Sequence, residues 1–421
     1  MLLLKNIAQV VTLAGDRAPR RGDEMRQLGI VEAGAIVVRG ERVAWVGPTR
    51  DLPADKIRRD WQVIDGVGLE LVALPGFVDA HTHPIFAGMR ATEYEARSEG
   101  RTYQEIAAAG GGIRTSTRQL REATVENLEA RVERFFRRFL HHGTTTIEAK
   151  SGYGLSVEDE IKSLEVLSNL RSLSRLEVVP TFLGAHDVPD EHRGSREEYI
   201  RQVIDVMIPQ VARKRLARFC DVFCDHGYFT VEEARAILTA ARAVGLGIRI
   251  HAEELARSGG AALAAELGAA SADHLEWVSD GDIEALAQAG TVATLLPGVP
   301  FNLGLSRYAP ARRLIAAGVP VALATDFNPG SCLTLNMQII LSIACSQMKM
   351  TPAEAITAAT VNAASSLGLA DRLGSIEAGK QADIVLMDVP DYRELPYFFG
   401  VNHCVVTIKK GNILVNRLEG P

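Results

Sequence analysis

The chain has 421 residues, of which 47% are hydrophobic and 23% are charged, a composition that excludes collagen, long disordered segments and coiled coils. Its net charge of -6 comes from 46 Lys and Arg against 52 Asp and Glu, without basic blocks. This balance gives no electrostatic footprint for a nucleic acid or an anionic membrane, so we expect neither as a partner. The length allows two or three compact units, although one barrel can use roughly 250 residues.

The five cysteines are scattered through mostly apolar segments, which indicates buried thiols in a reducing compartment, so we expect a cytoplasmic protein. Cys220 and Cys224 form a C-x3-C pair in a strand-like run, where we favour structural thiols over a metal pair. At the start, Lys5 and Asn6 interrupt the apolar stretch before it reaches the length of a signal peptide. No segment approaches the roughly 20 apolar residues of a membrane span.

Both ends of the chain have β-hairpin texture. Near the start, GAIVVRGERVAWVG places a turn at Arg39-Gly40-Glu41, and near the end HCVVTIKKGNILVN places one at Lys410-Gly411-Asn412. We expect residues 1–72 and 373–421 to pair into one small β-sandwich domain beside a barrel domain formed by residues 73–372.

Between these ends, apolar strands alternate with amphipathic helices, which predicts an α/β fold. Eight strand-like runs end in polar residues: LPGFVDAHTH, TTTIEAKSGYG, LEVVPTFLGAHD, FCDVFCDHG, GIRIHAEE, ASADHLEW, TVATLLPG and VALATDFNPG. Eight near-continuous apolar strands favour a closed (β/α)8 TIM-like barrel, with a doubly wound open sheet as the alternative. Helix-like stretches cover Val125 to His141, Val157 to Leu173, Glu197 to Ala212, Val231 to Val244, Ala261 to Leu267, Asp280 to Gln288, Pro310 to Ala317 and Thr351 to Leu367, and several end at glycine (Gly143, Gly245, Gly290, Gly318).

The polar strand ends are rich in His and Asp. Strand one ends His81-Thr82-His83, and side chains two apart on a strand point the same way, so both imidazoles can share one ion. An isolated H-x-H pair is more often a chance match. Here His251, His274 and Asp326 end later strands, and this donor set suits zinc and tolerates iron, manganese or nickel. We choose His81, His83, His251 and Asp326 as the metal ligands.

At this point the residues carry a family resemblance. The runs GFVDAHTH, IHAEE, ADH and ATDFNPGS resemble the metal-dependent amidohydrolase superfamily, over the barrel and both β-rich ends. Within it, HPIFAGMRATEY, GGGIRTST, EAKSGYGL, TFLGAHDVP, LLPGVPFNL and TDFNPGS resemble the imidazolonepropionase family of histidine degradation. The resemblance implies hydrolysis of the ring C–N bond, a cyclic amide, of 4-imidazolone-5-propanoate to N-formimidoyl-L-glutamate.

The resemblance also implies one metal ion per subunit, zinc or iron. Binuclear relatives bridge two metals with a carboxylated lysine on strand four, but the run FCDVFCDHG contains no lysine, and Lys150 ends strand two, so a mononuclear site follows. The family's metal ligands fall on the four residues already chosen. Its substrate-binding residues fall on Arg90, Tyr153, His186, Glu254, Asn328, Gly330 and Ser331, and we assign the catalytic roles to Asp326, His274, Glu254 and His186.

The alternatives stay open for the substrate residues. Arg90 would hold the propionate in a bidentate pair, or would be a surface arginine in a salt bridge. Tyr153 lies in S-G-Y-G, where glycines admit a substrate or simply form a turn, and Tyr103 is a weaker candidate for a second hydroxyl. His186 would donate to the ring, or would pair structurally with Asp187.

Glu254 follows His251 by three residues. If a helical turn begins there, both would face one side and Glu254 would bond a ring N–H; otherwise it is a helix-start glutamate. His274 would lie near the metal and stabilise the attacking water or the oxyanion. The loop Gly110 to Gly112 would be a mobile cover or a helix-breaking linker.

In the mechanism we expect, Asp326 takes a proton from water and returns it to the leaving ring nitrogen, while His274 or His186 stabilises the oxyanion. Three alternative functions are a deaminase with the same metal set, a non-catalytic small-molecule-binding barrel, and a nucleotide-binding oxidoreductase. The last is disfavoured because this chain has no G-x-G-x-x-G motif after its first strand. A homodimer is compatible with a barrel of this kind, but no interface signal is decisive.

Overall fold

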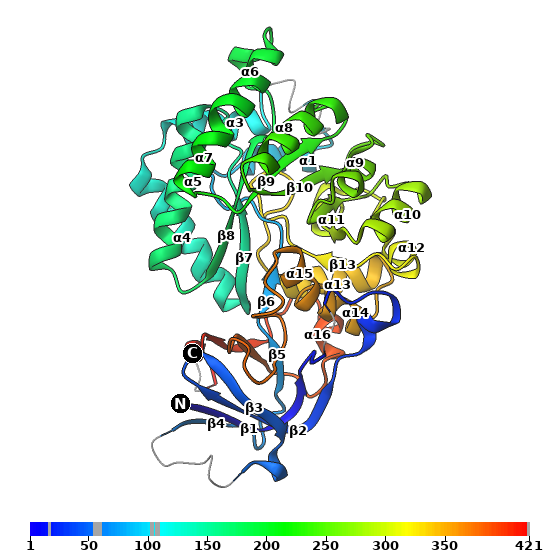
Figure 1. The fold of residues 1–421 in the computed structure, drawn as a ribbon. Helices are drawn as coiled ribbons and strands as arrows, with labels where there is room; N and C mark the ends of the chain where they lie inside the picture. The colour runs from blue at the N-terminus through cyan, green and yellow to red at the C-terminus, as the bar shows by residue number, and fades with distance from the viewer. Residues whose placement is uncertain (16–17, 54–60, 102–104, 106–109, 419–421) are drawn as a thin grey trace.

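The computed structural model describes residues 1–15, 18–53, 61–101, 105 and 110–418. The described residues form two sheets: a parallel barrel sheet of eight strands, and a second eight-stranded sheet that combines β1 to β5 with β14 to β16 (Figure 1). The (β/α)8 expectation is therefore confirmed, and the open-sheet alternative is wrong.

The barrel strands follow one another in chain order, and every neighbouring pair is parallel. Beyond the ends of the first and last strands, a bridge between Thr82 and Phe327 closes the ring, supported by Asp326 N–H donating to the His81 carbonyl at 3.0 Å. All eight predicted strands form: β6 (Phe77–Asp79), β7 (Thr144–Lys150), β8 (Glu177–Ala185), β9 (Phe219–Cys224), β10 (Gly247–Ala252), β11 (Ser271–His274), β12 (Val292–Leu295) and β13 (Val321–Leu323).

Helices cover the outside of the barrel (Figure 1). The caps match the sequence, since Thr124 and Ser156 accept N–H groups of the first turns of α4 and α5, and the four predicted closing glycines have φ between 74° and 87°. The helices and 3-10 turns are η1 (Gly22–Arg26), η2 (Thr49–Asp51), α1 (Ala91–Ser98), α3 (Ile113–Glu122), α4 (Val125–His141), α5 (Val157–Leu173), η4 (Asp190–His192), α8 (Val231–Ala243), α9 (Gly260–Leu267), α10 (Asp280–Ala289), α11 (Gly298–Leu303), α12 (Ala311–Ala316), α14 (Pro352–Ala358) and α15 (Val361–Ser366).

Several helical regions differ from the prediction: α1, α3 and α11 were not predicted, and the stretch Thr351 to Leu367 is divided into α14 and α15. Two further differences have a clear physical reason. The helix expected over residues 197–212 is divided into α6 (Arg196–Gln202), a π-helical segment η5 (Val203–Met207) and α7 (Ile208–Lys214), because Pro209 has no N–H to continue the α-helical ladder. The helix α13 (Met337–Gln347) was not predicted. Its sequence MQIILSIACSQ is apolar on most sides, since it is largely buried and packs against α14 and α16 (Glu394–Tyr397), so it lacks an amphipathic pattern.

The second sheet joins the two ends of the chain in the order β16-β15-β14-β5-β1-β2-β3, with β4 also paired to β1. Both predicted hairpin turns form, between β2 and β3 and between β15 and β16. The domain boundaries at residues 72/73 and 372/373 stay a prediction. The strands are β1 (Leu2–Val11), β2 (Ile30–Arg39), β3 (Arg42–Pro48), β4 (Gln62–Asp65), β5 (Val72–Pro75), β14 (Ile384–Met387), β15 (Cys404–Lys409) and β16 (Asn412–Asn416).

The barrel interior is layered. Apolar side chains such as Val78, Val179 and Phe219 pack together with α15 residues in one cluster near the amino ends of the strands. Above them lie charged side chains that are completely buried: Glu148, Lys150, Asp221, Arg249 and Asp273. Barrel interiors are usually filled by Val, Ile and Leu, so a charged layer of this kind requires its own explanation.

The cysteines agree with the expectation of buried thiols, since all five are free and only Cys345 is partly exposed. Burial raises the pKa of the Cys224 thiol to about 12, which removes the thiolate that a metal would need. Among the described residues, no helix combines the length and the apolar composition needed to cross a bilayer.

Candidate metal centre and active site

Four side chains from three strand ends converge at the carboxyl end of the barrel. The Nε2 atoms of His81 and His83 lie 3.2 Å apart, and His83 Nε2 lies 3.4 Å from His251 Nε2. The Asp326 Oδ1 atom lies 3.4 Å from His81 Nε2 and 3.3 Å from His83 Nε2. All four side chains are buried.

These separations fit a tetrahedral metal ion. With metal–nitrogen bonds of about 2.0–2.1 Å, the edges of a coordination tetrahedron are about 3.3–3.4 Å, close to the observed distances. The His274 ring also lies within reach, because His81, His251 and His274 offer nitrogen atoms within 4.8 Å of one another. The cluster is a His-rich metal-binding site.

Carboxylates behind the imidazoles determine which ring nitrogen faces the site. His81 Nδ1 donates to Asp273 at 2.7 Å, and His251 Nδ1 donates to Asp221 at 3.1 Å. Each bond places the proton on Nδ1 and leaves the Nε2 lone pair directed at the centre, which is the arrangement a ligating histidine needs.

The pKa values of His83 and Asp326 favour metal binding over proton binding, whereas at His81 the hydrogen bonds to Asp273 and Asp326 outweigh burial and raise the pKa. Burial lowers the pKa of His83 to about 4, so this imidazole is neutral at physiological pH. Burial alone would raise the pKa of Asp326, but the His81 and His83 imidazoles hold it well below its ordinary value. A deprotonated carboxylate and a neutral imidazole are the forms that ligate a metal.

The backbone at Asp326 is unusual. Asp326 has φ of 51°, in the left-handed region that non-glycine residues seldom adopt. The Asn328 amide holds this conformation by donating to the Asp326 carbonyl at 2.7 Å and to its Oδ2 at 3.0 Å. Asn328 Oδ1 accepts the N–H groups of Gly330 and Ser331 at 2.8 Å, so three of the predicted substrate residues form one turn around Asp326.

Arg90 is buried and packs against that turn. Its side chain is 3% exposed, so the surface alternative is wrong, and its Nε and Nη1 atoms have no hydrogen-bond partner among the described residues. The nearest carboxylate, on Glu93, lies 3.7 Å from Nε. A Cβ on Gly330 would lie 1.2 Å from Arg90 Nη2, so only glycine leaves room for the guanidinium.

Tyr153 and His186 form an adjoining wall. Their ring centroids lie 5.2 Å apart, and the His186 ring stacks on His83 at 5.3 Å. His186 Nδ1 donates to the Gly152 carbonyl at 2.8 Å, so the predicted pairing with Asp187 is wrong, and its Nε2 carries a lone pair. The neutral His186 therefore accepts a hydrogen bond through Nε2, whereas we expected it to donate.

The loop that carries Tyr153 is held from below by a glutamate that we did not predict. The carboxylate of Glu160, on α5, accepts N–H groups from Gly152, Gly154 and Leu155 at 2.8 to 3.2 Å. Glu160 is completely buried, and burial raises its pKa despite these bonds. The loop is thus a fixed structure. Tyr103 lies outside the described residues.

Glu254 reaches the site without the predicted helical turn. The helix α9 begins only at Gly260, and Asp225 instead fixes the loop by accepting the N–H groups of Glu254 and Leu255 at 2.7 and 3.0 Å. Glu254 Oε2 lies 3.5 Å from His274 Nε2. Burial, followed by the neighbouring Glu276, raises the pKa of Glu254 well above its ordinary value.

The third loop named in the sequence, Gly110 to Gly112, leads into α3, with Gly112 at the N-cap and its N–H donating to Glu93 at 3.1 Å. Residues 106–109 lie outside the described residues. The expectation of a mobile cover stays untested.

Comparison with known proteins agrees with this geometry. The amidohydrolase family model matches residues 72–414. An imidazolonepropionase of Solibacter usitatus is 54% identical over 397 residues, which are 94% of each chain, and one of Geobacillus kaustophilus is 48% identical over 99% of this chain and 98% of its own. The chain belongs to the imidazolonepropionases of the amidohydrolase family.

Solved structures of other proteins share the fold. An atrazine chlorohydrolase of Arthrobacter aurescens in complex with zinc has a TM-score of 0.65 and 18% identity, covering 100% of this chain and 96% of its own. An adenosine deaminase of Xanthomonas campestris with bound zinc has a TM-score of 0.67 and 20% identity, covering 100% and 94%. At these identities the likeness establishes the fold.

Membership in this family does not identify the residues behind the site, which the sequence reasoning missed. Asp221, Arg249 and Asp273 are charged residues inside otherwise apolar strands, and this was the signal that could have found them. Phe327 was also missed. Its ring packs against Phe86, Phe135 and Phe139 at centroid distances of 4.9 to 5.8 Å, which anchors the residue next to Asp326.

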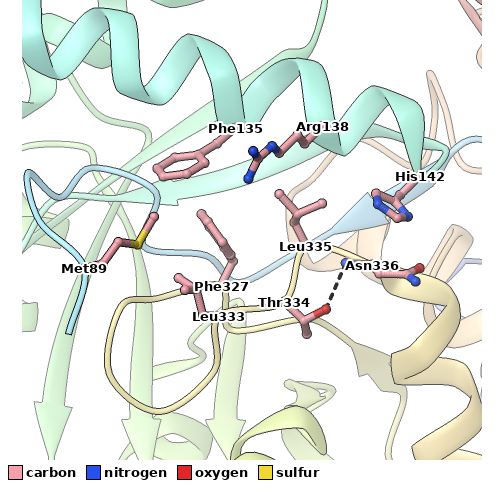
Figure 2. A pocket seen from close by; sticks show the side chains of 9 residues that line it. All are labelled: Met89, Phe135, Arg138, His142, Phe327, Leu333, Thr334, Leu335 and Asn336. Carbon is pink, nitrogen blue, oxygen red and sulfur yellow. Dashed lines mark hydrogen bonds between the residues drawn. The ribbon is translucent and has the colours of Figure 1, made fainter. Parts of the chain in front are cut away.

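A hollow of about 490 Å³ lies between α4 and the segment that follows Phe327 (Figure 2). Arg138 on α4 and His142, just after its end, face Thr334 and Asn336 across it, and the four candidate metal ligands are not among its lining residues. The complete lining is Met89, Phe135, Arg138, His142, Phe327, Leu333, Thr334, Leu335 and Asn336. Phe327, the neighbour of Asp326 in the chain, is the lining residue next to a candidate metal ligand.

Proposed function

We propose that this chain is a metal-dependent hydrolase that opens the ring C–N bond of 4-imidazolone-5-propanoate and gives N-formimidoyl-L-glutamate. One observation carries the proposal beyond the family relationship: three imidazoles and a carboxylate meet at 3.2 to 3.4 Å, beside a buried arginine with unpaired N–H groups. The first set suits a metal that acts on an amide, and the second suits the carboxylate of a propionate.

His81, His83, His251 and Asp326 would hold one metal ion, zinc or iron, and the zinc in the related structures favours zinc. When bound, such an ion polarises a carbonyl and lowers the pKa of a coordinated water toward about 7. The strand-four side chains fit a single ion, because β9 contributes Asp221, which bonds His251, and no lysine.

Asp326 is the proton carrier of the reaction. Its pKa is held well below the ordinary value, so Asp326 is an ionised carboxylate, the form that can accept a proton from the attacking water. The same proton then goes to the leaving ring nitrogen as the C–N bond breaks and the former ring carbonyl becomes a carboxylate. Asn328 keeps the carboxylate oriented by its bond to Oδ2.

Arg90 binds the propionate. Its Nε and Nη1 groups lie on different edges of the guanidinium and have no hydrogen-bond partner among the described residues, so each is available to donate to a carboxylate, and the buried environment strengthens such a charge-assisted bond. Tyr153, Gly330 and Ser331 complete the surroundings of this part of the substrate.

His186, Glu254 and His274 bind the ring. His186 Nε2 accepts from a ring N–H, since its Nδ1 proton is engaged with Gly152. Burial raises the pKa of Glu254 well above its ordinary value, and its carboxyl group, 3.5 Å from His274 Nε2, is placed to hydrogen-bond a ring N–H. His274, whose Nδ1 has no hydrogen-bond partner, is placed to stabilise the oxyanion that develops at the ring carbonyl.

The decisive experiment incubates the purified chain with 4-imidazolone-5-propanoate, follows the loss of ultraviolet absorbance, and measures metal content in the same sample. We expect turnover with close to one metal ion per chain, loss of turnover after chelation, and recovery with zinc. Release of ammonia from a nitrogen heterocycle in place of ring opening would favour a deaminase and overturn the proposal.

We place the reaction in the cytoplasm, since five free cysteines fit a reducing compartment. We also propose a homodimer as the assembly to test, and light scattering of the purified chain would decide between a monomer and a dimer.

A further inference from the structure

Five charged side chains form a layer across the barrel interior, beneath the imidazoles of the site. We call Glu148, Lys150, Asp221, Arg249 and Asp273 the buried charge layer, and each has 0% exposure. Transferring charges from water into a protein interior is costly, and pairing often only balances that cost. Stability alone is therefore a weak reason for charged residues where apolar ones would serve.

Lys150 lies at the centre of the layer. Its Nζ contacts Asp221 Oδ2 at 2.7 Å and Glu148 Oε1 at 2.8 Å, and lies 4.0 Å from Asp273 Oδ2. Arg249 supports the same Asp273 oxygen at 3.3 Å and also donates to the Ala80 carbonyl at 2.9 Å. The two cations thus fix the positions of Asp221 and Asp273 from below.

Those two carboxylates are the ones that orient the imidazoles. Asp273 accepts from His81 Nδ1 through Oδ2, the oxygen that also contacts Arg249, and Asp221 contacts His251 Nδ1. Glu148 contacts the strand that carries His81 and His83, since its Oε2 accepts the Thr82 N–H at 3.2 Å. The layer therefore reaches His81 and His251 through one carboxylate each.

The charge count also points to a cation above the layer. With all carboxylates ionised, three carboxylates and two cations leave one net negative charge, and Asp326 adds a second. A divalent ion at the imidazoles would neutralise the buried group as a whole, which lowers the cost of keeping these charges away from water.

We propose that Lys150 is a positioning residue for the metal centre: by holding Asp221 and Asp273, it fixes the ring orientation of His251 and His81 and so determines metal affinity. This inference rests on the metal ligands given under the proposed function. Residues that orient metal-ligating histidines commonly contribute 10–100-fold to metal affinity.

The test compares two buried lysines. Lys150→Met removes the ammonium and keeps the chain length, and Lys409→Met does the same to a lysine that is 3% exposed and paired with Asp383 at 2.7 Å in the terminal sheet. Zinc affinity is measured in chelator-treated protein by competition with a chromophoric chelator. The visible spectrum of the cobalt-loaded protein reports ligand geometry independently of activity.

We expect Lys150→Met to bind zinc at least tenfold more weakly than the unsubstituted chain and to change the cobalt spectrum, while Lys409→Met binds zinc normally. Equal zinc affinity in Lys150→Met and the unsubstituted chain, or equal weakening in both variants, would overturn the inference. If the unsubstituted chain itself binds no zinc, the ligand assignment fails instead, so the two failures are distinguishable.

Asp221→Asn provides a second variant in case Lys150→Met does not fold. It preserves side-chain volume and the acceptor for His251, and it removes the charge that Lys150 holds. Zinc affinity reduced at least tenfold in folded Asp221→Asn supports the positioning role, and unchanged affinity contradicts it.

Discussion

One buried lysine cluster lies inside the barrel and another lies where the terminal sheet meets the start of β8, and the two have nearly the same local geometry. Lys150 contacts Asp221 at 2.7 Å near the carboxyl ends of the strands, and Lys409 of the terminal sheet contacts Asp383 at 2.7 Å and lies 3.7 Å from Glu177, at the start of β8. The two clusters differ in the other groups that hydrogen-bond to the carboxylate paired with each lysine.

The Asp221 carboxylate also accepts a hydrogen bond from the imidazole of His251. The Asp383 carboxylate instead accepts from the Lys410 backbone N–H and the Gln381 side-chain amide. The Lys150 cluster is thus bonded to an imidazole that can bind a ligand. The Lys409 cluster is bonded only to backbone and amide groups that stabilise the fold. A buried ion pair alone therefore does not indicate a functional role. The other group that is hydrogen-bonded to its carboxylate distinguishes a functional pair from a structural one.

The largest effect is expected at the candidate metal site. Asp326→Asn removes the proton acceptor and one ligand charge, so kcat should fall by roughly 1,000-fold or more. Steady-state kinetics with metal analysis of the same sample check this. Near-normal turnover in the variant would contradict the assignment of Asp326.

At the Lys409 cluster, a substitution is expected to change stability and to leave kcat nearly unaffected. Asp383→Asn leaves Lys409 buried without its main counter-charge, which should lower the free energy of unfolding by about 3 kcal/mol. Urea denaturation measures the loss, and kcat should stay within about twofold of the unsubstituted value. A large fall in kcat with unchanged stability would remove the distinction between the two clusters.

An intermediate effect concerns substrate binding. Arg90→Ala should raise KM by roughly 30-fold, equivalent to about 2 kcal/mol of charge-assisted hydrogen bonding, with a smaller change in kcat. Gly330→Ala should raise KM in the same direction, because its Cβ would displace the guanidinium, and the two substitutions should not be additive. An unchanged KM in Arg90→Ala would place the propionate elsewhere.

Much of this site could be predicted because its signals are local. A polar residue directly after a buried apolar strand marks the carboxyl end of a barrel strand, and His81, His83, His251 and Asp326 all occupy such places. The positions of Arg249 and Asp273 could not be predicted, since their meeting depends on how β10 and β11 are staggered around the ring. Local sequence does not determine that stagger.

The same limit explains the errors. At Glu254 the spacing of three residues from His251 favoured a helical turn, but three backbone N–H groups bond to Asp225 from the preceding strand-end loop and hold the segment in another shape. The tautomer of His186 depends on the Gly152 carbonyl, 34 residues away in the chain. Both features come from tertiary contacts that a sequence pattern does not contain.

The smallest predicted effect is on pH dependence. Burial raises the pKa of Glu276 to about 8 in the metal-free protein, so the folded state keeps a proton that the unfolded state loses near pH 4.5. This contribution to folding stability is fully present below about pH 4.5, declines by up to about 1.4 kcal/mol per pH unit as the pH rises toward 8, and is constant above it.

Glu276→Gln removes the titrating group and keeps the side-chain shape. The free energy of unfolding of this variant should therefore decline less steeply with pH than that of the unsubstituted chain, between roughly pH 5 and 8. Urea denaturation of the two chelator-treated proteins at several pH values measures the difference, with Glu165→Gln, at an exposed ion pair with Lys214, as the control. Parallel stability curves would mean that Glu276 is already ionised in the folded protein. Glu276 would then place a negative charge 4.0 Å from His274 Nδ1, and an oxyanion could not be stabilised there without the positive charge of a metal ion.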